Sequence, residues 1–170
     1  MKIQGKQYHT IWLKEGDSKT VQVIDQRKLP FQFEVVDLKT TQDSWFAINE
    51  MVVRGAPLIG VTAAFGINIA LLEFQEGNLE TYLIEKADYL KSSRPTAVNL
   101  AFAVEEMLKF ILQEKSNPKL IEKTLEKANQ LKEKEIQFSE KIGEFGVNII
   151  EEIYETKKDT VNILTHCNAG

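Results

Sequence analysis

The stretch RGAPLIGVTAAFGINIALLEF, residues 54–74, predicts a helix built almost entirely from apolar and small side chains. Pro57 marks its start, because proline is favoured in the first helical turn, where its missing N–H costs nothing. We expect the helix to run to about Phe74. A glycine inside a helix costs roughly 1 kcal/mol relative to alanine, so close packing against a neighbouring helix or strand should compensate. The small side chains that would permit such an approach are Gly60, Ala63, Ala64, Gly66 and Ala70.

An arginine stands before this helix, and another stands before a second predicted helix. Arg54 lies three residues before Pro57, and Arg94 is followed by Pro95 and Thr96, either of which can open a helix. The free N–H groups and partial positive charge of a helix N-terminus suit a phosphate, and arginine adds a bidentate donor. Only three of the 21 basic residues are arginine. We predict that both arginines bind phosphate. The alternative, in which they tie loops to backbone carbonyls, stays open.

The first forty residues predict short strands. Their segments are rich in β-branched and aromatic side chains and are separated by turn formers. In the last segment Phe31, Phe33 and Val35 occupy alternate positions, which predicts one buried face. The three predicted strands are residues 7–13, 20–25 and 31–38.

From about residue 43 the hydrophobic period becomes helical. Asp43 or Ser44 is expected to cap a helix that runs to about Val53, and Asn78 a helix that runs to about Ser92. The segment between residues 43 and 115 therefore predicts four helices, with the fourth opened at Pro95 or Thr96.

A break at Ser116-Asn117-Pro118 precedes the most strongly periodic part of the chain. Apolar residues recur there at steps of three, four or seven, which predicts one long helix or two placed end to end. We expect this stripe to pack into the core and assign it no chemistry. Its members are Ile121, Leu125, Ala128, Leu131, Phe138, Ile142, Phe145, Ile149 and Ile153.

Residues 160–165 predict a buried strand that runs into His166-Cys167-Asn168-Ala169-Gly170. Such a strand needs parallel neighbours and crossover connections, so we expect a second, sheet-based domain outside this chain. The predicted division is residues 1–157 for a domain of antiparallel sheet and helical bundle, and residues 158–170 for the start of the second. Cys167 follows the strand where open α/β folds place ligands. It could act as nucleophile, acid–base group or transition-state stabiliser, or it could be a buried small hydrophobe.

Composition narrows the class of protein. Hydrophobic residues make up 43%, charged residues 27%, and the net charge is −4 without a basic cluster, which argues against a nucleic-acid surface. We identify no apolar run long enough to span a bilayer and no signal peptide, and so expect a cytoplasmic protein with no membrane partner. One cysteine excludes an internal disulfide, and with two histidines it makes a poor metal set. We expect neither a metal nor an organic cofactor.

Four motifs in order resemble the methylthioribose-1-phosphate isomerase family. They are Asp25-Gln26 followed by Leu29-Pro30, Met51-Val52-Val53-Arg54-Gly55-Ala56-Pro57, Ser93-Arg94-Pro95-Thr96-Ala97-Val98-Asn99-Leu100, and Ile163-Leu164-Thr165-His166-Cys167-Asn168-Ala169-Gly170. The resemblance extends from about residue 11 to the last residue. The wider superfamily includes regulatory subunits of translation initiation factor 2B and ribose-1,5-bisphosphate isomerases.

The resemblance implies an α/β protein with an N-terminal domain of antiparallel sheet and helical bundle and a Rossmann-like C-terminal domain, usually homodimeric. It implies conversion of 5-methylthioribose 1-phosphate to 5-methylthioribulose 1-phosphate in methionine salvage. It assigns substrate binding to Arg54, Gly55, Ala56 and Arg94, and transition-state stabilisation to Cys167. The family's catalytic aspartate belongs to the second domain, so we expect the isolated chain to be inactive or nearly so. A non-catalytic regulatory subunit and a ribose-1,5-bisphosphate isomerase remain alternatives.

Overall fold

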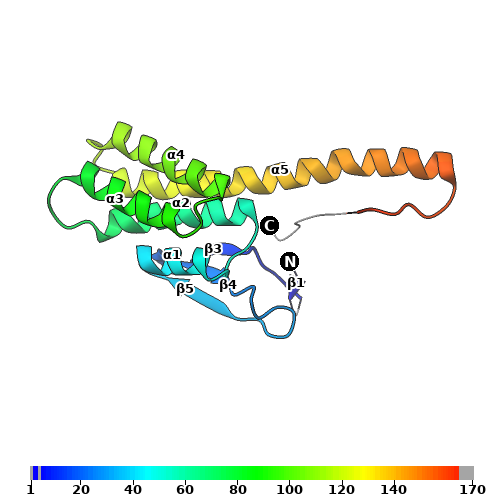
Figure 1. The fold of residues 1–170 in the computed structure, drawn as a ribbon, viewed down its shortest axis with the longest axis horizontal. Helices are drawn as coiled ribbons and strands as arrows, with labels where there is room; N and C mark the ends of the chain where they lie inside the picture. The colour runs from blue at the N-terminus through cyan, green and yellow to red at the C-terminus, as the bar shows by residue number, and fades with distance from the viewer. Residues whose placement is uncertain (1, 4, 165–170) are drawn as a thin grey trace.

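The computed structural model describes residues 2–3 and 5–164 and places strands at the N-terminal end and helices after them (Figure 1). Two antiparallel sheets form, one of two short strands and one of three strands in the order β3-β4-β5. The strands are β1 (Lys2–Ile3), β2 (Lys6–Gln7), β3 (Ile11–Lys14), β4 (Asp17–Ile24) and β5 (Val35–Leu38). The helices among the described residues are α1 (Thr41–Asn49), α2 (Ala56–Glu73), α3 (Leu79–Ser92), α4 (Val98–Glu114) and α5 (Leu120–Lys157).

The sheet differs from the sequence prediction at its edges. The predicted strand 7–13 divides into β2 and β3, and the predicted strand 31–38 forms only as β5. Phe31 is 92% exposed and Phe33 is 37% exposed, so the buried face expected there is wrong. The reason is a turn in which Phe31 N and Gln32 N both donate to the Lys28 carbonyl, at 3.1 and 2.9 Å, so this backbone is not available for a ladder.

The predicted helix starts are right for α2 and α3 and shifted for α1 and α4. Asn78 caps α3 as expected, accepting from Thr81 N. The cap of α1 is Thr40 rather than Asp43 or Ser44, because Asp43 occupies the N3 position of a capping box. Helix α4 begins at Val98, three residues after Pro95, because residues 94–97 form a turn closed by Ala97 N and the Arg94 carbonyl at 3.0 Å.

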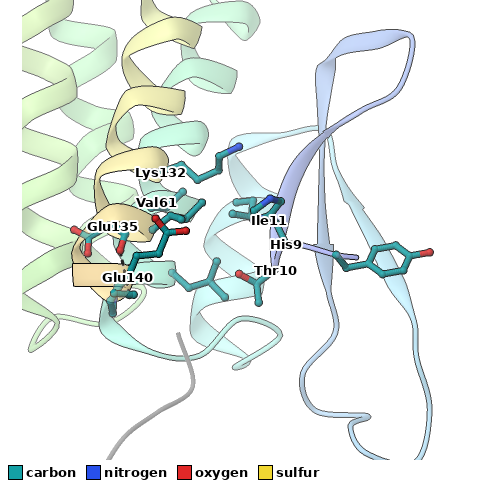
Figure 2. A pocket seen from close by; sticks show the side chains of 12 residues that line it. His9, Thr10, Ile11, Val61, Lys132, Glu135 and Glu140 are labelled. Carbon is teal, nitrogen blue, oxygen red and sulfur yellow. Dashed lines mark hydrogen bonds between the residues drawn. The ribbon is translucent and has the colours of Figure 1, made fainter. Parts of the chain in front are cut away.

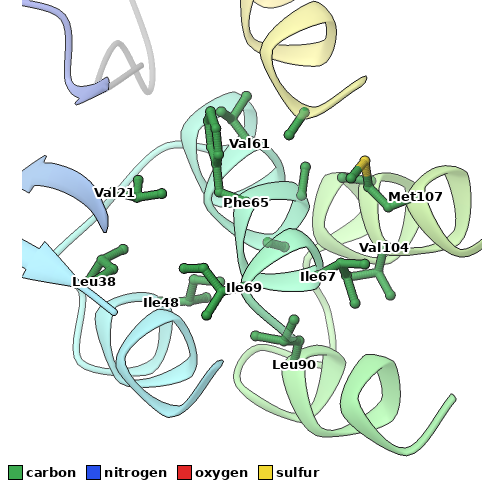
Figure 3. Packing of buried hydrophobic residues seen from close by; sticks show 14 of the residues in the cluster. Val21, Leu38, Ile48, Val61, Phe65, Ile67, Ile69, Leu90, Val104 and Met107 are labelled. Carbon is green, nitrogen blue, oxygen red and sulfur yellow. The ribbon is translucent and has the colours of Figure 1, made fainter. Parts of the chain in front are cut away.

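Helix α2 is the centre of the fold. It contacts the other four helices and β4, and Phe65, Ile67 and Ile69 are essentially inaccessible to solvent. Figure 3 shows these side chains between Val21 and Leu38 of the sheet and Val104 and Met107 of α4. The expected close packing at its glycines is present. A Cβ at Gly66 would lie 3.1 Å from both Leu90 and Ser44.

This helix corrects the expectation that no apolar run could span a bilayer. By length and composition α2 could do so, with a mean hydropathy of 1.6 over 18 residues. In the fold, 78% of it is buried, which is typical of a core helix. Its apolar character is explained by burial on all sides.

Helix α5 is one continuous helix, and only its first part packs on the bundle. Thr124 and Ala128 are buried, whereas Figure 1 shows the second part extending beyond the other helices. The prediction that the whole apolar stripe packs into the core is therefore wrong for Ile121, which is 47% exposed, and for Phe138 and the members after it, which are 46–73% exposed. Residues 160–164 form no strand, and Leu164 is 99% exposed.

Candidate functional site

The loop that carries Arg54 is fixed by the residues before it. Val52 and Val53 are buried. The Val52 carbonyl accepts from Gln26 N at 2.9 Å, and Val53 N donates to the Ala47 carbonyl at 3.1 Å. Ala47, Val52 and Val53 are all buried, so the backbone just before Arg54 is held by the core, while the Arg54 side chain is exposed.

Gly55 is the N-cap of α2 and has a φ of +91°, a region that favours glycine strongly. No side chain caps this helix. Its first intrahelical bond joins Ile59 N to the Gly55 carbonyl at 3.0 Å, so the N–H groups of Ala56 and Leu58 precede the ladder. The loop thus presents an arginine and unbonded helical N–H groups side by side in sequence.

The turn that carries Arg94 is held by the end of α3. Ser93 is buried, and its hydroxyl donates to the Leu90 carbonyl at 2.6 Å. The indole N–H of Trp45 donates to the Ser92 hydroxyl at 3.0 Å, which ties this turn to α1. Arg94 itself is half-buried. As with α2, no side chain caps α4.

Packing of α2 against α4 brings the two arginine-bearing segments to one end of the bundle. A Cβ at Gly60 would lie 2.9 Å from the Asn99 carbonyl oxygen, so the first turns of the two helices touch there. Figure 1 shows both helices starting at the end of the bundle from which α5 extends. Contact is possible because position 60 has no side chain.

The side chains of Arg54 and Arg94 form no hydrogen bond or ion pair within the part of the chain that the structure describes. Arg27 contrasts with both: its Nε and Nη2 donate to Asp25 at 2.9 and 2.7 Å, and it lies 5.9 Å from the Phe46 ring. The reading of Arg54 and Arg94 as structural ties to carbonyls is therefore not supported. Cations are disfavoured near helix N-termini, so two free arginines there favour a bound anion.

Three cavities adjoin these segments. The first, of about 290 Å³, lies between the start of β3, the first turns of α2 and the middle of α5 (Figure 2). Its wall is apolar on the side of Ile11, Leu58 and Val61, and it carries the carboxylates Glu135 and Glu140 of α5. The second, of about 280 Å³, is lined by Arg94 and its turn. The third, of about 210 Å³, lies where the first turns of α2 and α4 meet α5. Sequence reasoning missed the α5 carboxylates, because a mixed Lys/Glu helix resembles a solvated face and nothing local marks a long-range neighbour.

Cys167 lies outside the described residues, so its position relative to the arginines stays a prediction. Within residues 2–3 and 5–164, no group of three or more His, Cys, Asp and Glu side chains is arranged to hold a metal ion.

The ion pair between Asp25 and Arg27 makes the anchor of the Arg54 loop sensitive to acid. Asp25 is buried, and the hydrogen bond from Arg27 lowers its pKa below the usual value. A carboxylate with a lowered folded-state pKa stabilises the fold above its unfolded pKa of about 3.9, and this contribution is lost as pH falls below that value.

We expect Asp25→Asn to lower the free energy of unfolding at pH 7 by about 1–3 kcal/mol and to reduce the loss of stability between pH 4 and pH 2. Urea unfolding of both proteins at several pH values measures this. Asp88→Asn, on the exposed face of α3, is the control. Parallel acid profiles for wild type and Asp25→Asn would contradict the assignment.

Comparison with known proteins connects this geometry to a family. The sequence model of the Initiation factor 2 subunit family matches residues 52–170. The methylthioribose-1-phosphate isomerase of Desulfatibacillum aliphaticivorans is 45% identical over 172 residues, which covers 100% of this chain and 47% of that protein. The protein of the same name from Sulfurimonas denitrificans is 46% identical, over 96% of this chain and 45% of its own length. The chain spans about half the length of these relatives.

Solved structures give the same picture. The 5-methylthioribose 1-phosphate isomerase of Pyrococcus horikoshii matches with a TM-score of 0.65 and 30% identity, covering 74% of this chain and 36% of that one. The translation initiation factor eIF-2B subunit delta from A. fulgidus matches with a TM-score of 0.67 and 34% identity, covering 75% and 37%. About three quarters of this chain thus shares its fold with an enzyme and with a translation factor subunit.

Proposed function

The chain belongs to the initiation factor 2 subunit family, and on that premise we propose that it forms the phosphate-binding half of a sugar-phosphate isomerase. The reaction is the conversion of 5-methylthioribose 1-phosphate to 5-methylthioribulose 1-phosphate, a step of methionine salvage. Relatives of that name match essentially the whole chain at 45% and 46% identity. The solved structures do not separate the two classes, because the isomerase and the initiation factor subunit match at 30% and 34% identity over 74% and 75% of the chain.

The observation that carries the proposal is a pair of arginines at one end of the bundle that have no side-chain partner among the described residues. Arg54 and Arg94 would hold the substrate phosphate, with the N–H groups at Gly55 and Ala56 completing the cradle. An anion there would offset the charge that the arginines and two uncapped helix N-termini place at this end. A regulatory subunit without a small-molecule ligand would have no need of this arrangement.

The chemistry is an internal transfer of hydrogen, so substrate and product have the same composition. Phosphate on the anomeric oxygen prevents the spontaneous ring opening of a free sugar, and the enzyme must assist it. Hydrogen then moves from C2 to C1, and the C2 hydroxyl becomes the carbonyl. We assign Cys167 to stabilise charge at these carbons, and an acid from the second half of the protein to protonate the ring oxygen.

The cavity beside α2 favours a substrate with an apolar 5-substituent. Ile11, Leu58 and Val61 suit a methylthio group, whereas Glu135 and Glu140 would repel a second phosphate. This argues against ribose 1,5-bisphosphate as the substrate.

The remaining parts of the proposal follow from the family. The second half would be a Rossmann-like domain, and residues 160–164, which form no strand in this structure, would join its sheet only when parallel neighbours are present. The complete protein would be a cytoplasmic homodimer that binds a sugar phosphate and neither nucleic acid nor membrane. No metal or organic cofactor enters the proposed reaction.

An isomerase assay tests the proposal. We expect the 170-residue chain to show no turnover of 5-methylthioribose 1-phosphate, and the chain joined to the second half of the Desulfatibacillum aliphaticivorans enzyme to show it. Cys167→Ala in the joined protein should lower kcat by about 10²–10⁴-fold. A folded joined protein that binds the sugar phosphate without converting it would move the assignment to a regulatory subunit.

A further inference from the structure

The second part of α5 presents an apolar face that nothing in the described chain covers. Phe138, Ile142, Phe145, Ile149 and Ile153 recur at steps of four and three, so they lie on one side of the helix. They are 46–73% exposed. An exposed row of large apolar side chains of this length marks a contact surface. We refer to these five side chains as the α5 face.

Two glycines in the same part of α5 also indicate that another element contacts it. Glycine lowers helix stability more than any residue except proline, and in α2 the chain places it where another element touches, at Gly60 and Gly66. Gly143 and Gly146 are also inside a helix, yet a Cβ at either would meet nothing within 4 Å. On the helical wheel Gly146 borders the α5 face, and Gly143 lies further round the helix. No element among the described residues packs over either glycine.

We propose that the α5 face is the docking surface for the second half of the complete protein, whose backbone or small side chains approach over Gly146. This inference rests on family membership and not on the isomerase chemistry. Relatives from Desulfatibacillum and Sulfurimonas are about twice as long as the chain, and the family model matches the chain through residue 170, beyond α5. The relatives therefore contain about as much polypeptide again outside the part that matches this chain.

Charge argues against a second copy of α5 as the occupant. Residues 138–157 carry five carboxylates and two lysines. Two such helices laid together would bring like charges close along both rims. The second half would instead meet this surface with apolar side chains and a basic rim, leaving the carboxylates paired or in solvent.

Amide hydrogen exchange of residues 140–155 tests the docking directly. We compare the 170-residue chain with the same chain joined to the second half of the Desulfatibacillum aliphaticivorans protein. Exchange in the isolated chain should be fast, because few contacts hold this part of the helix, and joining should slow it on the order of 100-fold. Equal exchange in a joined protein would overturn the proposal.

Substitutions separate docking from a general effect on folding. Phe145→Ser should restore fast exchange in the joined protein, while Glu144→Ser, on the other side of the helix, should not. Gly146→Ala should slow exchange in the isolated chain, because alanine favours the helix, and speed it in the joined protein, because the added methyl group blocks close approach. The same direction in both proteins would contradict the glycine argument.

Sedimentation tests the alternative that the α5 face binds a second copy of the chain. If sedimentation shows the isolated chain as a dimer that Phe145→Ser dissociates, the α5 face pairs with itself and the proposal fails. None of these measurements uses catalytic activity, so a failure of the isomerase assignment would leave them interpretable.

Discussion

Replacing Arg54 and Arg94 together by alanine is expected to weaken sugar-phosphate binding by about 10²–10⁴-fold in the chain joined to the second half of a relative. A hydrogen bond to a charged group contributes about 1.5–3 kcal/mol, and two arginines would hold one phosphate. Neither side chain has a partner among the described residues, so their removal should leave the free energy of unfolding nearly unchanged. Titration calorimetry with 5-methylthioribose 1-phosphate and urea unfolding measure the two quantities.

Single substitutions distinguish a bidentate site from diffuse attraction. Arg94→Lys keeps the charge and loses the fork, so it should still weaken binding. Lys109→Ala, on the exposed side of α4, removes a charge outside the site and serves as the control. Unchanged affinity for the sugar phosphate in Arg94→Lys would refute the phosphate assignment. Equal losses of affinity in Arg94→Ala and Lys109→Ala would mean that only the net charge of the protein attracts the ligand.

The sequence was sufficient for the helices whose signals are local. Asn78 is a side-chain cap that acts within one turn, and α3 begins and ends where predicted. The break at Pro118 and the steps of three and four predicted the helical part after it. Proline was a weaker guide at residue 95, because its fixed φ also suits a turn, and the turn at residues 94–97 forms instead.

Failures of prediction came from long-range packing. The pattern of alternate positions at Phe31 and Phe33 holds for a strand only if a neighbour supplies hydrogen bonds, and the local turn takes that backbone. The apolar stripe of α5 predicted packing correctly at Leu125, Ala128 and Leu131, which contact the core, but not at Ile121, which is 47% exposed. From residue 138 onward the same pattern is exposed. Apolar periodicity predicts that one face of a helix packs against something, but it does not identify the polypeptide that packs there.

The candidate site was only partly predictable, because its residues come from distant parts of the chain. Helix starts and arginine scarcity identified Arg54 and Arg94 separately, and the chance that they share a ligand depended on how α2 crosses α4. The contact between Gly60 and Asn99 supplies that information. The carboxylates Glu135 and Glu140 come from α5, about 80 residues further along the chain from Arg54, and no spacing rule connects them.

The same contact gives the second large prediction, for Gly60→Ala. The added methyl group would lie 2.9 Å from the Asn99 carbonyl oxygen, which is backbone and cannot rotate away. Helix α4 must shift, and the turn carrying Arg94 must move with it relative to Arg54. Because a misplacement of about 1 Å can cost about 10²-fold in rate, we expect kcat/KM of the joined protein to fall by about 10–100-fold.

Gly66→Ala is the matched control, since it makes the same change in the same helix. Its methyl group would meet side-chain atoms of Leu90 and Ser44 at 3.1 Å. The flexible end of Leu90 can yield there, whereas the Asn99 backbone carbonyl at Gly60 cannot. Overpacking at either glycine should cost about 1–3 kcal/mol of stability, partly offset by the better helix propensity of alanine. Activity should fall for Gly60→Ala and change much less for Gly66→Ala. Equal effects of the two substitutions on activity would mean that the α2–α4 crossing supports the fold without setting the distance between the arginines.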